Sequence, residues 1–323
     1  MKRSITNNNI LITGGAGFIG SHLADALIEN SIGNLVVLDN LFLGTKQNLN
    51  LANKYKKFYF VNDDACDPNI LSYIIDKFEI ETVFNCATKP LNYSFINPKS
   101  AFDINTSITL NLLELQRRNK FNTLCHFSTS EVYGTSVNDV MNETHPFDPT
   151  TPYAAGKLAA DMAVLSYNKT FHLDCFIVRP FNNFGPRQNA IPPLAGIIPL
   201  TINRILEGLS PIIHGNGLQS RDFIFVNDTV ENIINLFSVI DKGEVINISS
   251  NNNISVKDLV SRISKRMGYN GNFKILKNRS ADVFRHKGCS QKLKNLIKQE
   301  VTDFDEALTK TIDWYSKLKS KDV

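Results

Sequence analysis

The chain has 323 residues, of which 42% are hydrophobic and 20% charged, with a formal net charge of +4. This apolar fraction is sufficient for a packed core and argues against a disordered chain. The mild charge argues against a dedicated nucleic-acid-binding protein but suits an anionic small molecule as ligand. The length predicts two lobes, or one large α/β domain with an appended lobe.

The cysteines and the N-terminus indicate a reduced, cytoplasmic protein. Five cysteines are spread along the chain without a CxxC pair, so we expect neither a disulfide framework nor a metal site. The opening MKRSITNNN is polar where a secretory signal is apolar. The longest apolar stretch, 191–200, is short and interrupted by prolines, so we expect no membrane span and no membrane partner.

The first 180 residues alternate β-branched runs with helical patterns, which is typical of parallel βαβ units. Strands are predicted at Ile10–Thr13, Leu35–Asp39, Phe58–Asn62, Thr82–Cys86, Thr123–Ser128 and Asp174–Arg179. Helices are predicted at Ser21–Glu29, Asn69–Lys77, Asn105–Arg118 and Tyr153–Thr170. Strands that are apolar on both faces predict a sheet covered by helices on both sides. The fold class is therefore α/β, a Rossmann-type doubly wound parallel sheet.

A second lobe is predicted beyond Arg179, where the pattern loosens into a loop rich in Pro and Asn. We assign residues 1–180 to the first domain and 181–323 to a smaller C-terminal lobe. Two strands and a helix are predicted within this lobe, at Asp222–Val226, Glu244–Ile248 and Asn227–Ile240. The segment of about 222–250 is expected to pack back on the first domain. The tail from Ser255 is predicted to be helical, with its lysines on a solvated face.

A glycine-rich turn follows the first predicted strand. Gly14, Gly17 and Gly20 have the spacing GxxGxxG between that strand and a helix. Glycine allows a tight turn and close approach of the backbone to a pyrophosphate, while the helix N-terminus offers free N–H groups. The first domain is therefore predicted to bind a dinucleotide here, with Phe18 and Ile19 among the contacts.

Asp39 ends the second predicted strand, about 20 residues beyond this turn. Its carboxylate can accept hydrogen bonds from ribose hydroxyls and repels a 2′-phosphate, so NAD is predicted over NADP. Asp64, after the third strand, is a candidate for the adenine amino group. The other expected cofactor contacts are Asn40, Ala65, Ala87, Lys89 and Asn105. For Lys89, contact with a cofactor phosphate, contact with a substrate phosphate and a solvent-facing loop position all remain open.

Tyr153 and Lys157 form a YxxxK pair in a predicted helix. Positions i and i+4 share one helical face, so the phenol and the ammonium point the same way. A nearby cation lowers the pKa of a phenol, which makes Tyr153 a candidate base near neutral pH. Lys157 can also hold the nicotinamide ribose. Thr129, at the end of a predicted strand, can hydrogen-bond the same substrate hydroxyl.

Together these motifs resemble the extended short-chain dehydrogenase/reductases, in the nucleotide-sugar epimerase/dehydratase group. The resemblance runs through TGGAGFIG, LDNL, STSEVYG, the Tyr153–Lys157 pair, RPFNNFGPR and GNGLQSRDFIFVND. It implies an NAD-dependent enzyme that binds a nucleotide-diphosphate sugar between its lobes. It also implies a homodimer, formed through the helices predicted at Asn105–Arg118 and Tyr153–Thr170.

The residues Thr129-Ser130-Glu131 resemble the dehydratases and the UDP-glucuronate decarboxylases, which place a Glu at the third position. A 4,6-dehydratase needs a second base, because it removes the C5 proton that a 4-keto group acidifies. We therefore predict that Tyr153 takes the C4 hydroxyl proton and Glu131 the C5 proton. Glu131, or a water held by Ser130, then protonates the departing C6 hydroxyl.

The resemblance also bears on the substrate. Thr-Ser-Glu resembles the GDP-mannose dehydratase type, and RPFNNFGPRQN resembles dehydratases of nucleotide-linked N-acetylglucosamine, so GDP- or UDP-N-acetylglucosamine is expected. Family matching assigns the substrate diphosphate to Asn182 and Arg221, with Arg187 and Arg279 as further candidates, and the nucleotide ribose to Asp282. Arginine suits this role because it grips phosphate oxygens bidentately. A UDP-glucuronate decarboxylase, a UDP-hexose 4-epimerase and a non-catalytic NAD-binding regulator remain alternatives.

Overall fold

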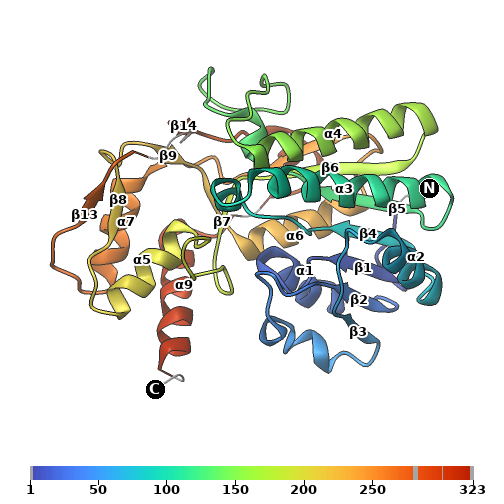
Figure 1. Cartoon of the computed structure of the whole chain (residues 1–323), viewed down its shortest axis with the longest axis horizontal. Helices are drawn as coiled ribbons and strands as arrows, with labels where there is room; N and C mark the ends of the chain where they lie inside the picture. The colour runs from blue at the N-terminus through green and yellow to red at the C-terminus, as the bar shows by residue number, and fades with distance from the viewer. Residues whose placement is uncertain (1–2, 279–282, 300, 321–323) are drawn as a thin grey trace.

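A computed structural model describes residues 3–278, 283–299 and 301–320. Seven parallel strands form one sheet in the order β11-β6-β5-β4-β1-β2-β3 (Figure 1). Their bounds are β1 Ile10–Thr13, β2 Leu35–Leu38, β3 Phe58–Val61, β4 Thr82–Asn85, β5 Thr123–Phe127, β6 Asp174–Pro180 and β11 Val245–Ile248. The predicted Rossmann-type sheet is confirmed, and its strand order reverses between β1 and β4.

Helices cover both faces of this sheet. Their bounds are α1 Phe18–Ile28 and α6 Val226–Phe237 on one face, and α2 Pro68–Lys77, α3 Pro98–Arg117 and α4 Pro152–Phe171 on the other. Successive residues of β1 alternate between the two cores: Ile10 and Ile12 pack in the cluster that includes α1 and α6, and Leu11 in the cluster that includes α2, α3 and α4. All four residues of β1 are therefore buried, which explains the continuous apolar run of its first three residues.

The remaining elements form a smaller lobe on the left of Figure 1. Its helices are α5 Ile197–Leu206, α7 Val256–Arg266 and α9 Phe304–Lys319, which share a core containing Ile202, Leu259 and Leu308. Short strands accompany them: β7 Asn182–Phe184, β8 Ile212–His214, β9 Ser220–Arg221, β10 Phe223–Phe225, β12 Ile254–Ser255, β13 Lys274–Leu276 and β14 Arg285–His286. The chain returns to the large sheet through α6, which packs on α1, and β11, which pairs with β6; α8 Gln291–Leu296 contacts β11.

Several predicted boundaries were wrong. Helix α3 begins at Pro98, because the Asn97 side chain caps it by accepting the backbone N–H of Ser100 at 3.0 Å and proline suits the first helical position. The strand predicted at Asp222–Val226 is β10, Phe223–Phe225, and it pairs with β7 outside the main sheet. The tail is not helical throughout, because β13 pairs with β8 and β14 with β9.

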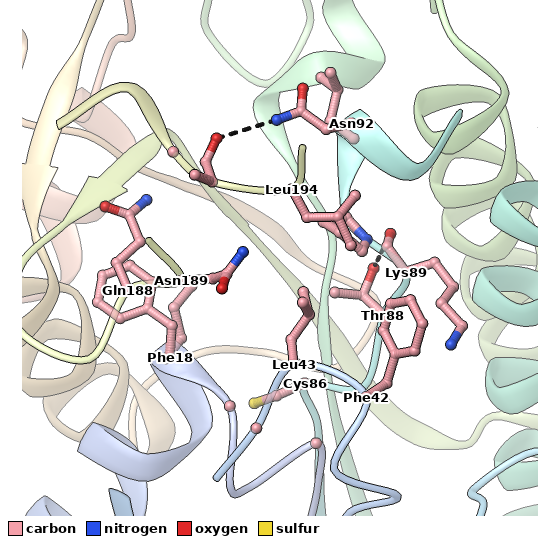
Figure 2. Close-up of a pocket in the computed structure, with 18 of the residues that line it drawn as sticks. Phe18, Phe42, Leu43, Cys86, Thr88, Lys89, Asn92, Gln188, Asn189 and Leu194 are labelled. Carbon is pink, nitrogen blue, oxygen red and sulfur yellow. Dashed lines mark hydrogen bonds between the residues drawn. The ribbon is translucent and has the colours of Figure 1, made fainter. Parts of the chain in front are cut away.

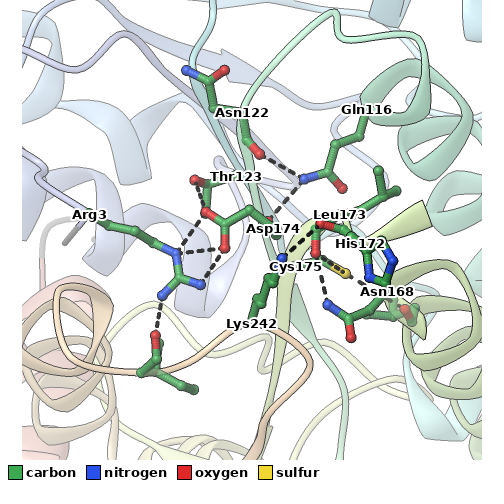
Figure 3. Close-up of polar contacts among 12 residues, drawn as sticks. Arg3, Gln116, Asn122, Thr123, Asn168, His172, Leu173, Asp174, Cys175 and Lys242 are labelled. Carbon is green, nitrogen blue, oxygen red and sulfur yellow. Dashed lines mark hydrogen bonds and ion pairs between the residues drawn. The ribbon is translucent and has the colours of Figure 1, made fainter. Parts of the chain in front are cut away.

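The N-terminal segment is attached to the edge of β6 through Arg3 (Figure 3). The Arg3 Nε donates to both carboxylate oxygens of Asp174, at 3.0 and 2.9 Å, and another guanidinium nitrogen donates to the Ile240 carbonyl. Thr123 donates to the same carboxylate from β5 at 2.8 Å. Arg3 also lies over the ring of Phe176, 5.1 Å from its centroid. The segment before β1 thus contacts β6 and the loop after α6, at a carboxylate that also accepts from β5.

Candidate active site

A cavity of about 520 Å³ lies between the two lobes, at the carboxyl ends of the sheet strands. This is the expected place for a ligand in an open α/β sheet. Figure 2 shows Phe18, Gln188 and Asn189 on the left of it, and Thr88, Phe42 and Lys89 on the right. Across its rim, Asn92 donates to the Ala195 carbonyl at 3.2 Å. A second hollow of about 360 Å³ adjoins this cavity, because the two share several lining residues.

The glycine-rich turn forms one wall of the cavity. A Cβ on Gly14 would lie 2.7 Å from the Ala87 backbone, and one on Gly20 would lie 2.4 Å from the Gly14 carbonyl, so both positions require glycine. Gly17 is the N-cap of α1, without a side-chain cap and without an acidic residue in the first turn. The N–H groups at this helix end therefore lack a side-chain acceptor and suit a pyrophosphate.

Asp39 shapes this turn as well as facing the cavity. One of its carboxylate oxygens accepts the Ala16 N–H at 3.0 Å, and the other accepts the Leu41 N–H at 2.8 Å. Burial raises the pKa of this carboxyl, and the backbone hydrogen bonds oppose that rise. A carboxylate offers about four lone-pair sites, so Asp39 can still accept hydrogen bonds from ribose.

The other predicted cofactor contacts lie at neighbouring strand ends. Asn40, Asp64, Ala65 and Ala87 line the cavity, and the Asn40 amide donates to Asp64 at 3.3 Å. Asn105 does not appear among the cavity-lining residues that the structure describes. Its side-chain carbonyl accepts the Lys89 N–H at 2.8 Å and the Thr88 hydroxyl at 3.0 Å. It therefore supports the loop after β4.

Lys89 lines the cavity beside two aromatic rings. Its Nζ lies 3.2 Å from the centroid of the Phe42 ring and 5.4 Å from that of Tyr93, which is a cation–π geometry. Burial lowers the pKa of Lys89. The ammonium thus joins the loop after β2 to the 3₁₀ turn η3 (Leu91–Phe95).

Tyr153 and Lys157 project from the first turns of α4 into the adjoining hollow. The Thr151 side chain caps this helix by accepting the Ala154 N–H at 3.2 Å. The Lys157 Nζ is buried and donates to the Phe127 carbonyl at 2.8 Å. Burial lowers the pKa of Lys157 to about 8, and the Asp161 carboxylate opposes that shift.

The phenol of Tyr153 is buried in this hollow. Burial raises the pKa of its phenol to about 12, and the negative charge of Glu131 acts in the same direction. Hydrogen bonds with Thr129 and Thr88 oppose the rise without overcoming it. Desolvation therefore outweighs these hydrogen bonds, so the surroundings of Tyr153 favour the protonated phenol.

Glu131 lies where the two hollows meet and lines both. It belongs to the 3₁₀ turn η4 (Ser130–Tyr133), and its backbone N–H donates to the Thr129 side chain at 3.2 Å. Its carboxylate side chain is 13% exposed, and Oε1 lies 3.9 Å from the His286 Nδ1. Ser130 is buried and lines the second hollow. A phenol, a hydroxyl and a carboxylate therefore face one space.

Three of the predicted substrate residues, Asn182, Arg187 and Arg221, line the larger cavity. The Arg187 guanidinium lies 2.6 Å from the Asp25 carboxylate on α1, which neutralises much of its charge. Arg221 donates to the carbonyls of Ser220, at 3.0 Å, and Val283, at 2.6 Å. The other two, Arg279 and Asp282, lie outside the described residues.

Sequence reasoning missed two side chains of this site. Thr88 follows the carboxyl end of β4, so its position at a strand end was an available signal. His286 comes from β14, far along the chain from the other site residues. Among the described residues, no group of three or more His, Cys, Asp or Glu side chains is arranged to hold a metal ion. Within the same ranges, none of the helices is both long and apolar enough to cross a membrane.

This site matches a known family. A family model described as GDP-mannose 4,6 dehydratase matches residues 11–319, so the chain belongs to this family. It is an enzyme of the extended short-chain dehydrogenase/reductases, which confirms the resemblance seen in the sequence. NAD is the cofactor of these enzymes.

Both dehydratases and epimerases are similar to this chain. A Methanocaldococcus jannaschii protein, provisionally named a UDP-glucose 4-epimerase, is 34% identical over 94% of this chain and 97% of its own. The UDP-N-acetylglucosamine 4-epimerase of Methanobrevibacter ruminantium, solved with UDP-N-acetylmuramic acid, is 30% identical, with a TM-score of 0.88 over 97% of this chain and 99% of its own. The Bacillus anthracis dTDP-glucose 4,6-dehydratase, solved with NAD, is 29% identical, with a TM-score of 0.88 over 97% and 98%. The chain is therefore a nucleotide-sugar dehydratase or epimerase.

Proposed function

We propose that the chain is an NAD-dependent nucleotide-sugar 4,6-dehydratase, a lyase that forms a 4-keto-6-deoxy sugar nucleotide. The observation that carries this proposal is the position of Glu131, which lines the same hollow as Tyr153 and Thr129. A 4-epimerase needs only oxidation and return of hydride at C4. A carboxylate beside the phenol adds the second base that an elimination requires.

The residues of the larger cavity hold the cofactor in this proposal. The N-terminus of α1, with Gly14, Gly17 and Gly20, receives the pyrophosphate, and Asp39 receives the adenosine ribose. Lys157 holds the nicotinamide ribose through its ammonium. When bound, NAD supplies the acceptor for the C4 hydride, returns that hydride to C6, and contributes a positive charge that favours tyrosinate.

Tyr153 and Glu131 move the protons. Tyrosinate at Tyr153 takes the C4 hydroxyl proton as C4 is oxidised, with Thr129 hydrogen-bonded beside it. The 4-keto group acidifies C5, and Glu131 takes the C5 proton. The C6–O bond then breaks, and the hydroxyl leaves as water with the proton that Glu131 or a water on Ser130 donates. Tyr153 returns its proton to C5 as C6 is reduced, so the overall loss is one water.

The substrate that we propose is GDP- or UDP-N-acetylglucosamine. Asn182 and Arg221 face the cavity from the smaller lobe and are assigned to the diphosphate. Residues 181–323, without α6 and β11, form the side of the site that binds the substrate. We further propose a homodimer through α3 and α4, which expose Phe102, Leu110 and Met162.

A substrate panel tests this function. The purified protein is incubated with the UDP-, GDP- and dTDP-hexoses, their N-acetyl forms and UDP-glucuronate in deuterated water. The dehydratase proposal expects a product lighter by one water, with solvent deuterium at C5. Inversion at C4 alone would make the chain an epimerase, which the 34% identical relative favours as the second candidate. Loss of carbon dioxide from UDP-glucuronate would make it a decarboxylase.

The variant Tyr153→Phe separates an enzyme from a non-catalytic NAD-binding protein. It removes the phenolic oxygen but keeps the ring, so turnover is expected to fall by at least about 100-fold while NAD stays bound. Turnover that survives this change intact would contradict the roles given above.

A further inference from the structure

His286 lies directly behind the proposed elimination site. It is fully buried in β14, 156 residues after Ser130. Both of its ring nitrogens have polar partners. The Nε2 lies 2.9 Å from the Ser130 carbonyl oxygen. The Nδ1 lies 3.4 Å from the Asn182 amide nitrogen and 3.9 Å from Glu131 Oε1. One side chain from the smaller lobe thus contacts three residues that line the second hollow.

The partners of the two nitrogens define where the protons of His286 lie. A carbonyl oxygen only accepts, so Nε2 carries a hydrogen and donates it to Ser130. In the neutral ring Nδ1 is then an acceptor and receives the Asn182 N–H. A second proton would enter at Nδ1, where it faces the Glu131 carboxylate and opposes the Asn182 donor. The ring therefore has one neutral and one charged arrangement.

The surrounding charges couple this choice to Glu131. Burial lowers the pKa of His286, and the charges of Arg221 and His145 act in the same direction. The Glu131 carboxylate and the hydrogen bond to Ser130 raise it. Arg221 on β9 is paired with His286 in the strand register, and its positive charge disfavours the imidazolium. Glu131 is the anion that favours the imidazolium. Protonation of one member of the pair changes the proton affinity of the other.

We propose that His286 is the positioning residue for Glu131, because it holds the Ser130 carbonyl through Nε2 and faces the Glu131 carboxylate with Nδ1. The Glu131 carboxylate takes the C5 proton of the substrate. Glu131 is then neutral, and its proton passes to the departing C6 hydroxyl, which leaves as water and returns Glu131 to the carboxylate. The hydrogen bond from Nε2 fixes the Ser130–Glu131 turn during this exchange. This inference rests on the proposed 4,6-dehydratase function.

The first test separates the coupling from the reaction. Histidine labelled with ¹³C at Cε1 is titrated by NMR in the intact protein, and the signal of His286 is assigned by its loss in His286→Gln. In Glu131→Gln the midpoint of His286 is expected to move to lower pH, because the anion that favours the imidazolium is gone. An unchanged midpoint would overturn the inference. This measurement needs no turnover, so it stands even if no sugar is dehydrated.

The second test uses His286→Gln, whose amide N–H can keep the contact with Ser130 but cannot titrate. Reduction of bound NAD at 340 nm in a single turnover measures oxidation at C4, and deuterium at C5 measures the elimination. We expect the first rate to stay within about threefold of the wild type and the second to fall about 10- to 100-fold, with a changed pH profile. A wild-type pH profile and elimination rate in His286→Gln would refute the role of His286, whereas a wild-type protein that dehydrates no sugar would refute the proposed function instead.

Discussion

Asp161 lies one turn after Lys157 in α4, and its carboxylate raises the pKa of the lysine against the lowering effect of burial. Asp161 is itself fully buried and accepts hydrogen bonds from Arg179 at 2.9 Å and from Ser128 at 2.8 Å. The buried network of Asp161, Arg179 and Ser128 therefore favours the charged form of Lys157. Electrostatic coupling between buried charges is strong because little water screens it.

The substitution Asp161→Asn is expected to lower the pKa of Lys157 below about 8. The loss of the carboxylate removes the charge that favours the ammonium, so the alkaline limb of kcat/KM should move to lower pH. Because Arg179 loses its ion-pair partner, stability should also fall, by about 3 to 5 kcal/mol. The pH profile is measured with the preferred sugar nucleotide. Ser128→Ala is the control, since it removes one hydrogen bond and no charge, and an equal shift in both variants would contradict the electrostatic role.

The buried lysine also makes stability depend on pH. The pKa of Lys157 is about 8 in the folded protein, below its ordinary value of 10.5, so the unfolded chain binds more protons between these values. The free energy of unfolding should therefore rise with pH in this window, by at most about 1.4 kcal/mol per unit from this group. Lys157→Met should lose that slope. Urea unfolding at pH 8, 9 and 10 measures both proteins, and parallel curves would refute the assignment.

Asp39 should affect the glycine-rich turn as well as the cofactor. In Asp39→Asn, the amide can keep only one of the two acceptors that receive the N–H groups of Ala16 and Leu41. The affinity for NAD is expected to fall by about 10-fold or more, the equivalent of 1.4 kcal/mol. Discrimination against NADP should fall too, because the negative charge that repels a 2′-phosphate is lost. Calorimetric titration with both dinucleotides measures this, with Asp64→Asn as the matched control. Unchanged selectivity would show that Asp39 only shapes the turn.

The sequence was sufficient where function depends on local spacing. The glycine triplet and the Tyr153–Lys157 pair depend on turn and helix geometry, and they line the two adjoining hollows. Boundaries were less predictable: capping by Asn97 moved the start of α3 and placed Asn105 in mid-helix, under a loop. No local pattern predicts a contact between distant segments, so the pairing of Arg187 with Asp25 and the approach of His286 to Glu131 became visible only in the fold.

The attachment of the N-terminal segment through Arg3 should contribute to stability without affecting catalysis. The Arg3 side chain is 11% exposed and donates from Nε and Nη2 to the two carboxylate oxygens of Asp174, at the opposite end of β6 from Pro180, which lines the second hollow. Such charge-assisted, bidentate pairs are stronger than ordinary ion pairs, so Arg3→Ala should lower the free energy of unfolding by about 2 kcal/mol. Arg3→Lys keeps the charge but lacks the planar fork, so it should recover only part of the loss.

Thermal and urea unfolding of the three proteins measure this order of stability, and kcat/KM should remain unchanged in all of them. Asp174 would keep its hydrogen bond from Thr123 in both variants, so the edge of β6 is not left without a donor. An Arg3→Ala protein as stable as the wild type would mean that the segment before β1 contributes nothing to the fold. A fall in kcat/KM with unchanged stability would instead connect β6 to the site, because β6 carries Arg179 of the Asp161 network at its other end.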